Sequence, residues 1–295
     1  MSRMTFLAVA LLISSSAFAA ESESDYVVRR NTVQPQAVAE WETGATANIA
    51  VDAEAKKAPA NASRYTERAY VFPTGSVRIL DFDKNAPVFH KVTTETALRV
   101  MKGSIEIDMD GAKTKLNEGD IVQSPKGVFR GAASQNDTQI LLWKTTSKVA
   151  NPKTGIIRAD AAKPTFSAEW EENGKSVRAA TPEDLAKAPK DAMRLTVMRY
   201  ELDGNSVRVV TSVNKGVSST TSGKIDGIGY ITFGNAILVE NGKEYPIGPG
   251  DVFRQVGGAT HNWKRGGDVQ FVSTSTMPTD GKERPIPPGV REDAR

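Results

Sequence analysis

Two stretches of the chain decide its fold: RVMKGSIEIDMDGAKTKLNEGDIVQSPKGVFRGA (residues 99–132) and YITFGNAILVENGKEYPIGPGDVFRQVGGATHNW (residues 230–263). They align without a gap at an offset of 131 residues, and four glycines coincide in that alignment. The coincident pairs are Gly103 with Gly234, Gly111 with Gly242, Gly119 with Gly250, and Gly127 with Gly258. Self-similarity at a fixed spacing indicates a repeated structural unit. The sequence therefore predicts two homologous domains in tandem.

The similarity extends upstream of these stretches with small shifts. GSVRIL (75–80) matches NSVRVV (205–210), AEWE (39–42) matches AEWE (168–171), and KAP (57–59) matches KAP (187–189). We therefore place the two repeated domains at residues 37–150 and 166–277, joined by a linker over 151–165. A segment over residues 20–36 precedes them. A proline-rich, charged segment over 278–295 follows them as a tail or strap.

Within each repeat the sequence predicts short strands. Runs such as VRILDF, SIEIDMDG and QILLWKT are alternating or rich in β-formers, and Gly, Asn, Asp and Pro bound them. Asp110-Gly111 and Asn241-Gly242 predict hairpin turns, because these residues tolerate positive φ. In the arm of the second repeat, Thr181 as a cap followed by Pro182 predicts a short helix. The expected fold class is all-β, a sandwich or barrel per repeat with short helical arms.

The first nineteen residues predict a cleaved signal peptide. Arg3 gives a basic start, residues 6–13 form an apolar core, and small residues end at Ala19, after which we expect cleavage. The apolar run is far shorter than the roughly 20 residues that cross a bilayer, and no later stretch is apolar enough to do so. The chain has no cysteine, which excludes disulfides. We expect a periplasmic or secreted protein without a membrane span.

The charge pattern argues against a nucleic-acid partner. The formal net charge is +3, and removal of the signal peptide with Arg3 lowers it to +2. Acidic and basic residues are interspersed, without a block of lysines and arginines or an array of aromatic and basic residues. A nucleic-acid-binding surface needs such a concentration of positive charge. We expect a small-molecule ligand instead.

The two quoted stretches resemble the second sequence motif of the cupin superfamily, here duplicated as in bicupins. That motif reads Gly, five residues, Pro-x-Gly, two residues, His. The first repeat matches it through GDIVQSPKGVFR but has Arg130 where the family has its histidine. The second repeat keeps His261 and has Val256 in place of the proline. The resemblance implies two tandem jelly-roll β-barrels and covers roughly half to two-thirds of the chain that follows the signal peptide.

The first cupin motif, His-x-His followed by Glu and Gly, is eroded in both repeats. In the first repeat its three ligand positions hold His90, Val92 and Thr96. In the second repeat they hold Thr221, Gly223 and Gly227. A carboxylate lies next to the glutamate position in each repeat, Glu95 in the first and Asp226 in the second.

This erosion bears on the metal that the resemblance implies. A mononuclear cupin metal usually has three histidines and one carboxylate, a set that suits a divalent transition metal. The whole chain has two histidines, His90 and His261, one in each repeat. Arg130 would repel a cation at the first site because its guanidinium is always protonated. We therefore favour no bound metal. If one is bound, His261 and Asp226 are its expected ligands.

Three residues of the first repeat are candidate ligand-binding residues: Arg130, His90 and Glu95. Pointing inward, Arg130 would offer a guanidinium fork to a carboxylate or phosphate. It could equally form an internal ion pair, or face solvent if its strand is shifted. His90 could help Arg130 at a barrel mouth or be half-exposed, and Glu95 could be an exposed carboxylate.

His261 and Asp226 are the candidate catalytic pair of the second repeat. Asp226 would orient the imidazole of His261 for general acid–base work. In the alternative interpretation, a backbone carbonyl satisfies His261. We further expect Trp41 and Trp170 of the repeated AEWE to plug the base of each barrel or the contact between barrels. Trp143 and Trp263 are expected in the core or at the rim.

Three functions remain open from the sequence. The leading one is an exported bicupin that binds a small, anionic organic ligand, a carboxylate or acidic sugar, without a bound metal. The second is a metal-dependent cupin enzyme of oxygenase, decarboxylase or lyase type with atypical ligands around His261. The third is a structural protein that forms a homodimer through its arm and tail.

Overall fold

The computed structural model describes residues 25–92, 97–109, 112–123, 127–133, 136–146, 148–149, 153–173 and 175–293. The predicted signal peptide, its cleavage site after Ala19, and Glu95 lie outside these residues. Within them, no helix has both the length and the apolar character needed to cross a membrane.

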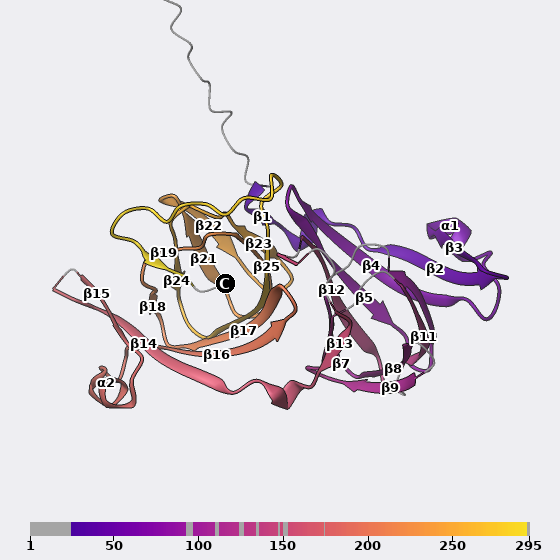
Figure 1. Cartoon of the computed structure of the whole chain (residues 1–295), viewed down its shortest axis with the longest axis horizontal. Coiled ribbons are helices and arrows are strands. Elements are labelled where there is room, and N and C mark those ends of the chain that lie inside the picture. The colour runs from indigo at the N-terminus through magenta and orange to yellow at the C-terminus, as the bar shows by residue number, and fades with distance from the viewer. Residues whose placement is uncertain are drawn as a thin grey trace, which may run out of the picture.

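Two β-rich bodies lie side by side, one built from each repeat (Figure 1). The first barrel consists of β2 (Gln36–Thr43), β3 (Thr46–Val51), β4 (Ser63–Phe72), β5 (Gly75–Phe82), β6 (Pro87–Val92), β7 (Ala97–Lys102), β8 (Ser104–Met109), β9 (Ala112–Asn117), β10 (Ile121–Gln123), β11 (Gly127–Ala133) and β12 (Thr138–Thr145). Helix α1 (Asp52–Ala55) follows β3. The all-β prediction is confirmed.

The second barrel repeats this order. It consists of β14 (Pro164–Glu172), β15 (Lys175–Ala179), β16 (Met193–Leu202), β17 (Asn205–Val213), β18 (Gly216–Val217), β19 (Thr221–Ser222), β20 (Asp226–Phe233), β21 (Ala236–Glu240), β22 (Lys243–Ile247), β23 (Val252–Gln255), β24 (His261–Arg265) and β25 (Val269–Thr276). Helix α2 (Pro182–Lys187) lies in its arm. Three short strands remain: β1 (Val27–Val28), β13 (Gly155–Ile157) and β26 (Arg291–Glu292).

Each barrel closes on an apolar core because successive residues of a strand face opposite sides. In β8, Ile105 and Ile107 are buried while Glu106 between them is exposed. The core of the second barrel includes Phe253 and Trp263, whose rings meet edge to face at 4.9 Å. The conserved offset between the repeats thus reflects two copies of one hydrophobic pattern.

The local signals read from the sequence are confirmed where the structure describes them. Asn241 and Gly242 adopt φ of 49° and 80° and join β21 to β22, as a tight hairpin turn requires. Thr181 caps α2, and its hydroxyl accepts a hydrogen bond from the Asp184 amide at 3.2 Å. The Asp110-Gly111 turn lies outside the described residues.

The two barrels exchange their leading strands. Strand order in the first large sheet is β13-β10-β7-β12-β5-β4-β2-β3, and in the second it is β1-β23-β20-β25-β17-β16-β14-β15. β1 precedes the first barrel in the chain but pairs with β23 of the second. β13 precedes the second barrel but pairs with β10 of the first. Each leading segment is therefore structurally part of the other barrel.

A carboxylate from the repeated Gly-Asp pair anchors the exchanged segment on the first barrel. Asp120 accepts hydrogen bonds from the amide of Ala159 at 2.9 Å and from the guanidinium of Arg158 at 2.7 Å. It also accepts the amide of Asn117 from its own turn at 3.0 Å. Burial by itself raises the pKa of Asp120, but these hydrogen bonds outweigh burial, so the pKa lies below its ordinary value.

Asp251 does the same on the second barrel. It accepts the amide of Arg30 at 2.8 Å and pairs with the guanidinium of Arg29 at 3.3 Å. The amide of Gly248, from the same turn, donates to Asp251 Oδ2 at 3.0 Å, the oxygen that Arg29 also contacts. The preceding Gly250 has a φ of +91°, a conformation that favours glycine. The Gly-Asp pair of each repeat therefore both turns the chain and holds the exchanged segment.

An apolar core also joins the two barrels. It contains Trp143 and Ile79 from the first barrel and Val209 and Ile228 from the second, all buried. Trp143 is fully buried there, while Trp263 lies inside the second barrel. The barrels therefore form one continuous folded unit.

Asp226 belongs to this contact between the barrels. It is buried and accepts hydrogen bonds from the Thr74 hydroxyl at 2.8 Å, Arg254 Nε at 2.7 Å and the Gly257 amide at 2.8 Å. Thr74 comes from the first barrel and the other two donors come from the second. The carboxylate thus stabilises the inter-barrel contact.

Trp41 and Trp170 lie elsewhere than the sequence suggested. Trp170 packs beside Leu185 of α2 in a small cluster of alanines on the arm of the second barrel. Trp41 packs in the equivalent cluster beside Ala55 of α1. The repeated tryptophans neither plug the barrels nor join them. They hold each short helix against its hairpin, because alternation along the strand turns them away from the barrel interior.

We predict that Asp120→Asn destabilises the protein in a pH-dependent way. The folded pKa lies below the ordinary value of 3.8, so the unfolded chain binds the proton more readily. The stabilisation is fully present well above the unfolded pKa of 3.8 and is lost as pH falls through the folded pKa. At pH 7 the free energy of unfolding should fall by about 1–3 kcal/mol, measured by urea denaturation. The difference should shrink towards pH 2. Asp160→Asn, an exposed neighbour, should change little at any pH; equal effects of both variants would contradict the assignment.

We also predict that Asp226→Ala acts on stability. It leaves the largely buried guanidinium of Arg254 without its carboxylate, which typically costs about 3–5 kcal/mol of unfolding free energy. Thr74→Val removes one of the three donors and should cost about 1 kcal/mol. Denaturant melts of both variants check the order. An Asp226→Ala protein as stable as the wild type would refute this structural role.

Candidate functional site

The repeated AEWE places one glutamate inside each barrel. Glu40 of β2 and Glu169 of β14 face the interior, on the opposite side of the strand from the tryptophans, and both are buried. A buried carboxylate needs a partner of opposite charge or hydrogen bonds. The two barrels supply these in different ways.

In the first barrel Glu40 is paired with His90. Its Oε2 lies 3.0 Å from His90 Nδ1, and both side chains are buried. The Tyr65 ring packs edge-on against the imidazole, and burial raises the pKa of Tyr65 well above its usual range. Within the described part of the chain His90 Nε2 has no hydrogen-bond partner, and it borders a cavity of about 10 Å³ between apolar side chains such as Leu80 and Phe129. A cavity of that size holds about one water molecule, so the first barrel is a packed core.

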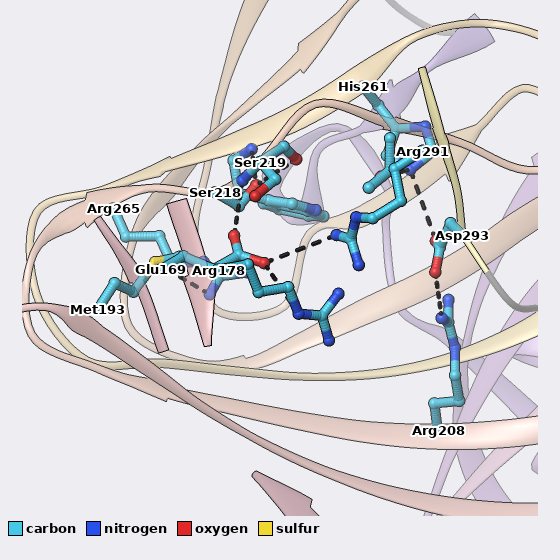
Figure 2. Close-up of polar contacts among 12 residues, drawn as sticks. Glu169, Arg178, Met193, Arg208, Ser218, Ser219, His261, Arg265, Arg291 and Asp293 are labelled. Carbon is cyan, nitrogen blue, oxygen red and sulfur yellow. Dashed lines mark hydrogen bonds and ion pairs between the residues drawn. The ribbon is translucent and has the colours of Figure 1, made fainter. Parts of the chain in front are cut away.

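In the second barrel Glu169 meets several arginines, as Figure 2 shows. The Ser219 amide donates to its Oε2 at 2.6 Å. Arg178 Nε and an Arg291 terminal nitrogen each lie 3.6 Å from its Oε1. Arg178 comes from β15, whereas Arg291 comes from the C-terminal strand β26.

Arg265 of β24 lies buried next to this cluster (Figure 2). Its terminal nitrogen reaches the sulfur of Met193 at 3.5 Å, and its guanidinium lies over the Trp263 ring at 5.6 Å from the centroid. Its Nε is buried without a hydrogen-bond partner. Burial lowers the pKa of Arg265 to about 10, and nearby Glu169 opposes that shift. Arg265 is still protonated at neutral pH, so it adds a buried positive charge.

A second group of polar side chains surrounds His261, which is buried in the same barrel (Figure 2). The Thr221 hydroxyl lies 2.9 Å from His261 Nε2. Asp293 Oδ2, from the end of the chain, lies 3.6 Å from the same nitrogen. The other oxygen of Asp293 accepts a hydrogen bond from Arg208 at 3.1 Å.

The electrostatics of this interior favour an anion. Among the residues that the structure describes, four guanidinium groups and three carboxylates gather here; the guanidiniums of Arg208 and Arg265 are largely buried, whereas those of Arg178 and Arg291 are more exposed. The guanidiniums are those of Arg178, Arg208, Arg265 and Arg291; the carboxylates are those of Glu169, Glu240 and Asp293. One of the three carboxylates, that of Asp293, is brought in by the C-terminal segment rather than by a barrel strand. The same segment also brings in Arg291, so the barrel strands by themselves contribute three of the guanidiniums and two of the carboxylates, an excess of positive charge.

Arg130 does not point into the first barrel. In strand register Phe129 lies opposite His90, whereas in the second barrel His261 lies opposite Thr221. The second repeat is therefore one residue longer between the Gly-Asp turn and this strand, and a one-residue shift moves a side chain to the other face. Arg130 accordingly faces solvent, where it pairs with Glu42 at 2.8 Å. The structure therefore agrees with the alternative in which the strand is shifted and Arg130 faces solvent.

The predicted pair of His261 and Asp226 is not formed. His261 faces the interior of the second barrel, whereas Asp226 faces the first barrel and pairs with Arg254. His261 lies on β24 and Asp226 lies on β20. Their side chains face opposite sides of the wall of the second barrel. Of the candidate residues, His90 and His261 therefore lie inside their barrels, Arg130 and Asp226 do not, and Glu95 is outside the described residues.

Sequence reasoning missed the charged residues that share the barrel interiors with these histidines. Glu40 and Glu169 could have been found from the sequence, because each is the first glutamate of the repeated AEWE. Arg208 recurs as the arginine of the matching runs GSVRIL and NSVRVV, where Arg78 is its counterpart. Asp293 lies outside the repeat, and nothing in its neighbourhood points to the barrel.

The residues around His261 do not fit the divalent metal that the cupin resemblance implies. Thr221, Gly223 and Gly227 occupy the other ligand positions. The carboxylate of Asp293, 3.6 Å from the imidazole, is already bound to Arg208, a permanent cation. A metal ion there would have a single imidazole ligand, that of His261, and would be repelled by the charge of Arg208. We therefore derive no chemistry through a metal.

No protein-family model matches the chain, and no curated protein does. Solved structures are similar to it. A mutant of the Bacillus subtilis oxalate decarboxylase OxdC superposes with a TM-score of 0.54 at 12% identity, covering 87% of this chain and 80% of that one. AerE from Microcystis aeruginosa superposes with a TM-score of 0.52 at 11% identity, covering 72% and 93%.

A further structure of the same decarboxylase, described through its Mn(II) centres, gives a TM-score of 0.52 at 11% identity and the same coverage, 87% and 80%. At such identities the likeness carries the architecture and not the chemistry. It agrees with the two barrels, their equivalent strand orders and the motif spacing. The chain therefore has the two-barrel fold of the bicupins.

Proposed function

We propose that this is an exported protein whose second barrel binds a small organic anion, a carboxylate or an acidic sugar, without a bound metal. One observation carries the proposal: the barrel already holds a carboxylate, that of Asp293, between Arg208 at 3.1 Å and His261 at 3.6 Å. The barrel strands contribute the cationic and polar side chains. The carboxylate comes from a segment outside the barrel.

The immediate surroundings of Arg208 support a ligand there. Ser273 lies directly opposite Arg208 on the neighbouring strand, so both side chains face the barrel interior. The Ser273 hydroxyl is buried and has no hydrogen-bond partner among the residues that the structure describes. Buried hydroxyls are normally satisfied, so an unsatisfied one beside a guanidinium is an available contact for a polar ligand. A guanidinium, a hydroxyl and an imidazole together match the acceptor oxygens of a carboxylate.

The first barrel supports no such role. Among the residues that the structure describes, its interior holds two ion pairs, Glu40 with His90 and Glu67 with Arg78, so each charge there is already matched, and the cavity beside His90 is too small for an organic molecule. We therefore assign binding to the second barrel and a structural role to the first. The arrangement supports binding, and no reaction step is assigned.

We predict that malonate binds the protein and that Arg208→Met weakens binding roughly 10-fold or more, as expected for loss of a charge-assisted hydrogen bond. Isothermal calorimetry with acetate, malonate, succinate and galacturonate at constant ionic strength measures it. Arg130→Met, which removes an exposed arginine of the first barrel, is the matched control and should leave affinity unchanged. Loss of binding in Arg130→Met but not in Arg208→Met would overturn the assignment.

We further predict that the protein purified from the periplasm carries far less than one transition metal ion per chain. The reason is the donor set around His261, in which guanidinium and hydroxyl groups stand beside a single imidazole. Elemental analysis of the wild type and of His261→Ala checks this. About one metal ion per chain in the wild type, lost in His261→Ala, would contradict the proposal and favour a metal-dependent enzyme.

A further inference from the structure

We infer that residues 277–293, here called the C-terminal strap, are an internal ligand of the second barrel, which an external carboxylate displaces. This inference rests on the proposed function, since it concerns the same site. It adds that the site is regulated by the chain's own tail and that its ligand is a short carboxylate, of the size of the Asp293 side chain.

The strand of the strap lies on the second barrel. This strand, β26, pairs in parallel with β19, with Thr221 opposite Arg291 and Ser222 opposite Glu292. The next amide, that of Asp293, donates to the Ser222 carbonyl at 2.8 Å. In the first barrel the sheet of described strands ends at β6, the counterpart of β19. The strap therefore completes the sheet next to His261 and directs Asp293 into the barrel.

Polar contacts hold the strap, and apolar packing contributes little. The Arg284 amide donates to the Lys224 carbonyl at 2.7 Å. Two ion pairs, Lys148 with Glu283 at 2.8 Å and Lys224 with Glu292 at 3.2 Å, join partly exposed side chains. None of the described apolar core clusters contains a strap residue. Exposed ion pairs contribute only about 0–1 kcal/mol each and weaken with salt, so the closed strap depends mainly on its backbone hydrogen bonds and on the contacts of Asp293 and Arg291 inside the barrel.

The contact of Asp293 with Arg208 makes strap and ligand competitors. One guanidinium cannot give the same donors to two carboxylates, so a bound ligand requires Asp293 to leave. If the strap is closed about nine-tenths of the time, the apparent affinity for the ligand is reduced roughly 10-fold. Removal of the Asp293 charge should restore that affinity.

The test compares malonate binding to the full chain and to Asp293→Asn by calorimetry. We expect Asp293→Asn to bind malonate roughly 10-fold more tightly than the wild type. Glu292→Gln is the matched control, because it removes the adjacent carboxylate, which pairs with Lys224 at the surface. It should change the affinity less than about two-fold by the same competition argument.

Hydrogen exchange on the unmodified chain gives an independent readout. Malonate should accelerate exchange of the Arg284 and Asp293 amides, which donate to Lys224 and Ser222 in the closed strap. Equal malonate affinities for wild type and Asp293→Asn, with strap amides equally protected, would overturn this inference and leave the proposed function standing. No malonate binding to either protein would contradict the proposed function and this inference together.

Discussion

The whole architecture depends on two carboxylates that hold the exchanged strands. Asp120 and Asp251 each accept a backbone amide from the segment that leads into the other repeat. Those hydrogen bonds place β13 on β10 and β1 on β23, which covers sheet edges that would otherwise be open to pairing with other chains. With both leading strands crossed over, neither barrel can separate without breaking strand pairs. The apolar core between the barrels, around Trp143, then forms in a fixed geometry.

On this common scaffold the two interiors have diverged around the same residue. The glutamate of AEWE enters both barrels, but Glu40 meets one histidine among aliphatic and aromatic side chains, whereas Glu169 meets several arginines. A buried charge without a partner costs several kcal/mol, so each glutamate constrains what surrounds it. In the first barrel Glu40 pairs with His90 beside an apolar core. In the second barrel Arg178, Arg265 and Arg291 carry more positive charge than the Glu169 carboxylate neutralises, and this excess favours an anion.

The sequence was enough to predict the fold because glycine spacing and strand patterns repeat over long segments. The tandem repeat, the Asn241-Gly242 hairpin and the Thr181 cap all depend on local chemistry, which sequence expresses directly. The site was harder to predict from the sequence, because it depends on the direction in which individual side chains point. An ungapped alignment equated Arg130 with His261, and one extra residue in the second repeat places them on opposite faces. The prediction for Asp226 was wrong for a related reason, because its side chain points towards the first barrel.

The presence of the strap on one barrel follows from the charges of that barrel. Arg208 is largely buried on a strand whose position is fixed by its neighbours, so its guanidinium cannot reach water easily when no ligand is present. A buried guanidinium without an acceptor is strongly unfavourable, whereas one bound to a carboxylate is stable. Asp293 supplies that carboxylate from the same chain, and β26 delivers it by pairing with β19. In the first barrel Arg78, the counterpart of Arg208, is also largely buried, but it already pairs with Glu67 of its own sheet. A strap there would have no charge to satisfy, so the asymmetry of the tail reflects the asymmetry of the two interiors.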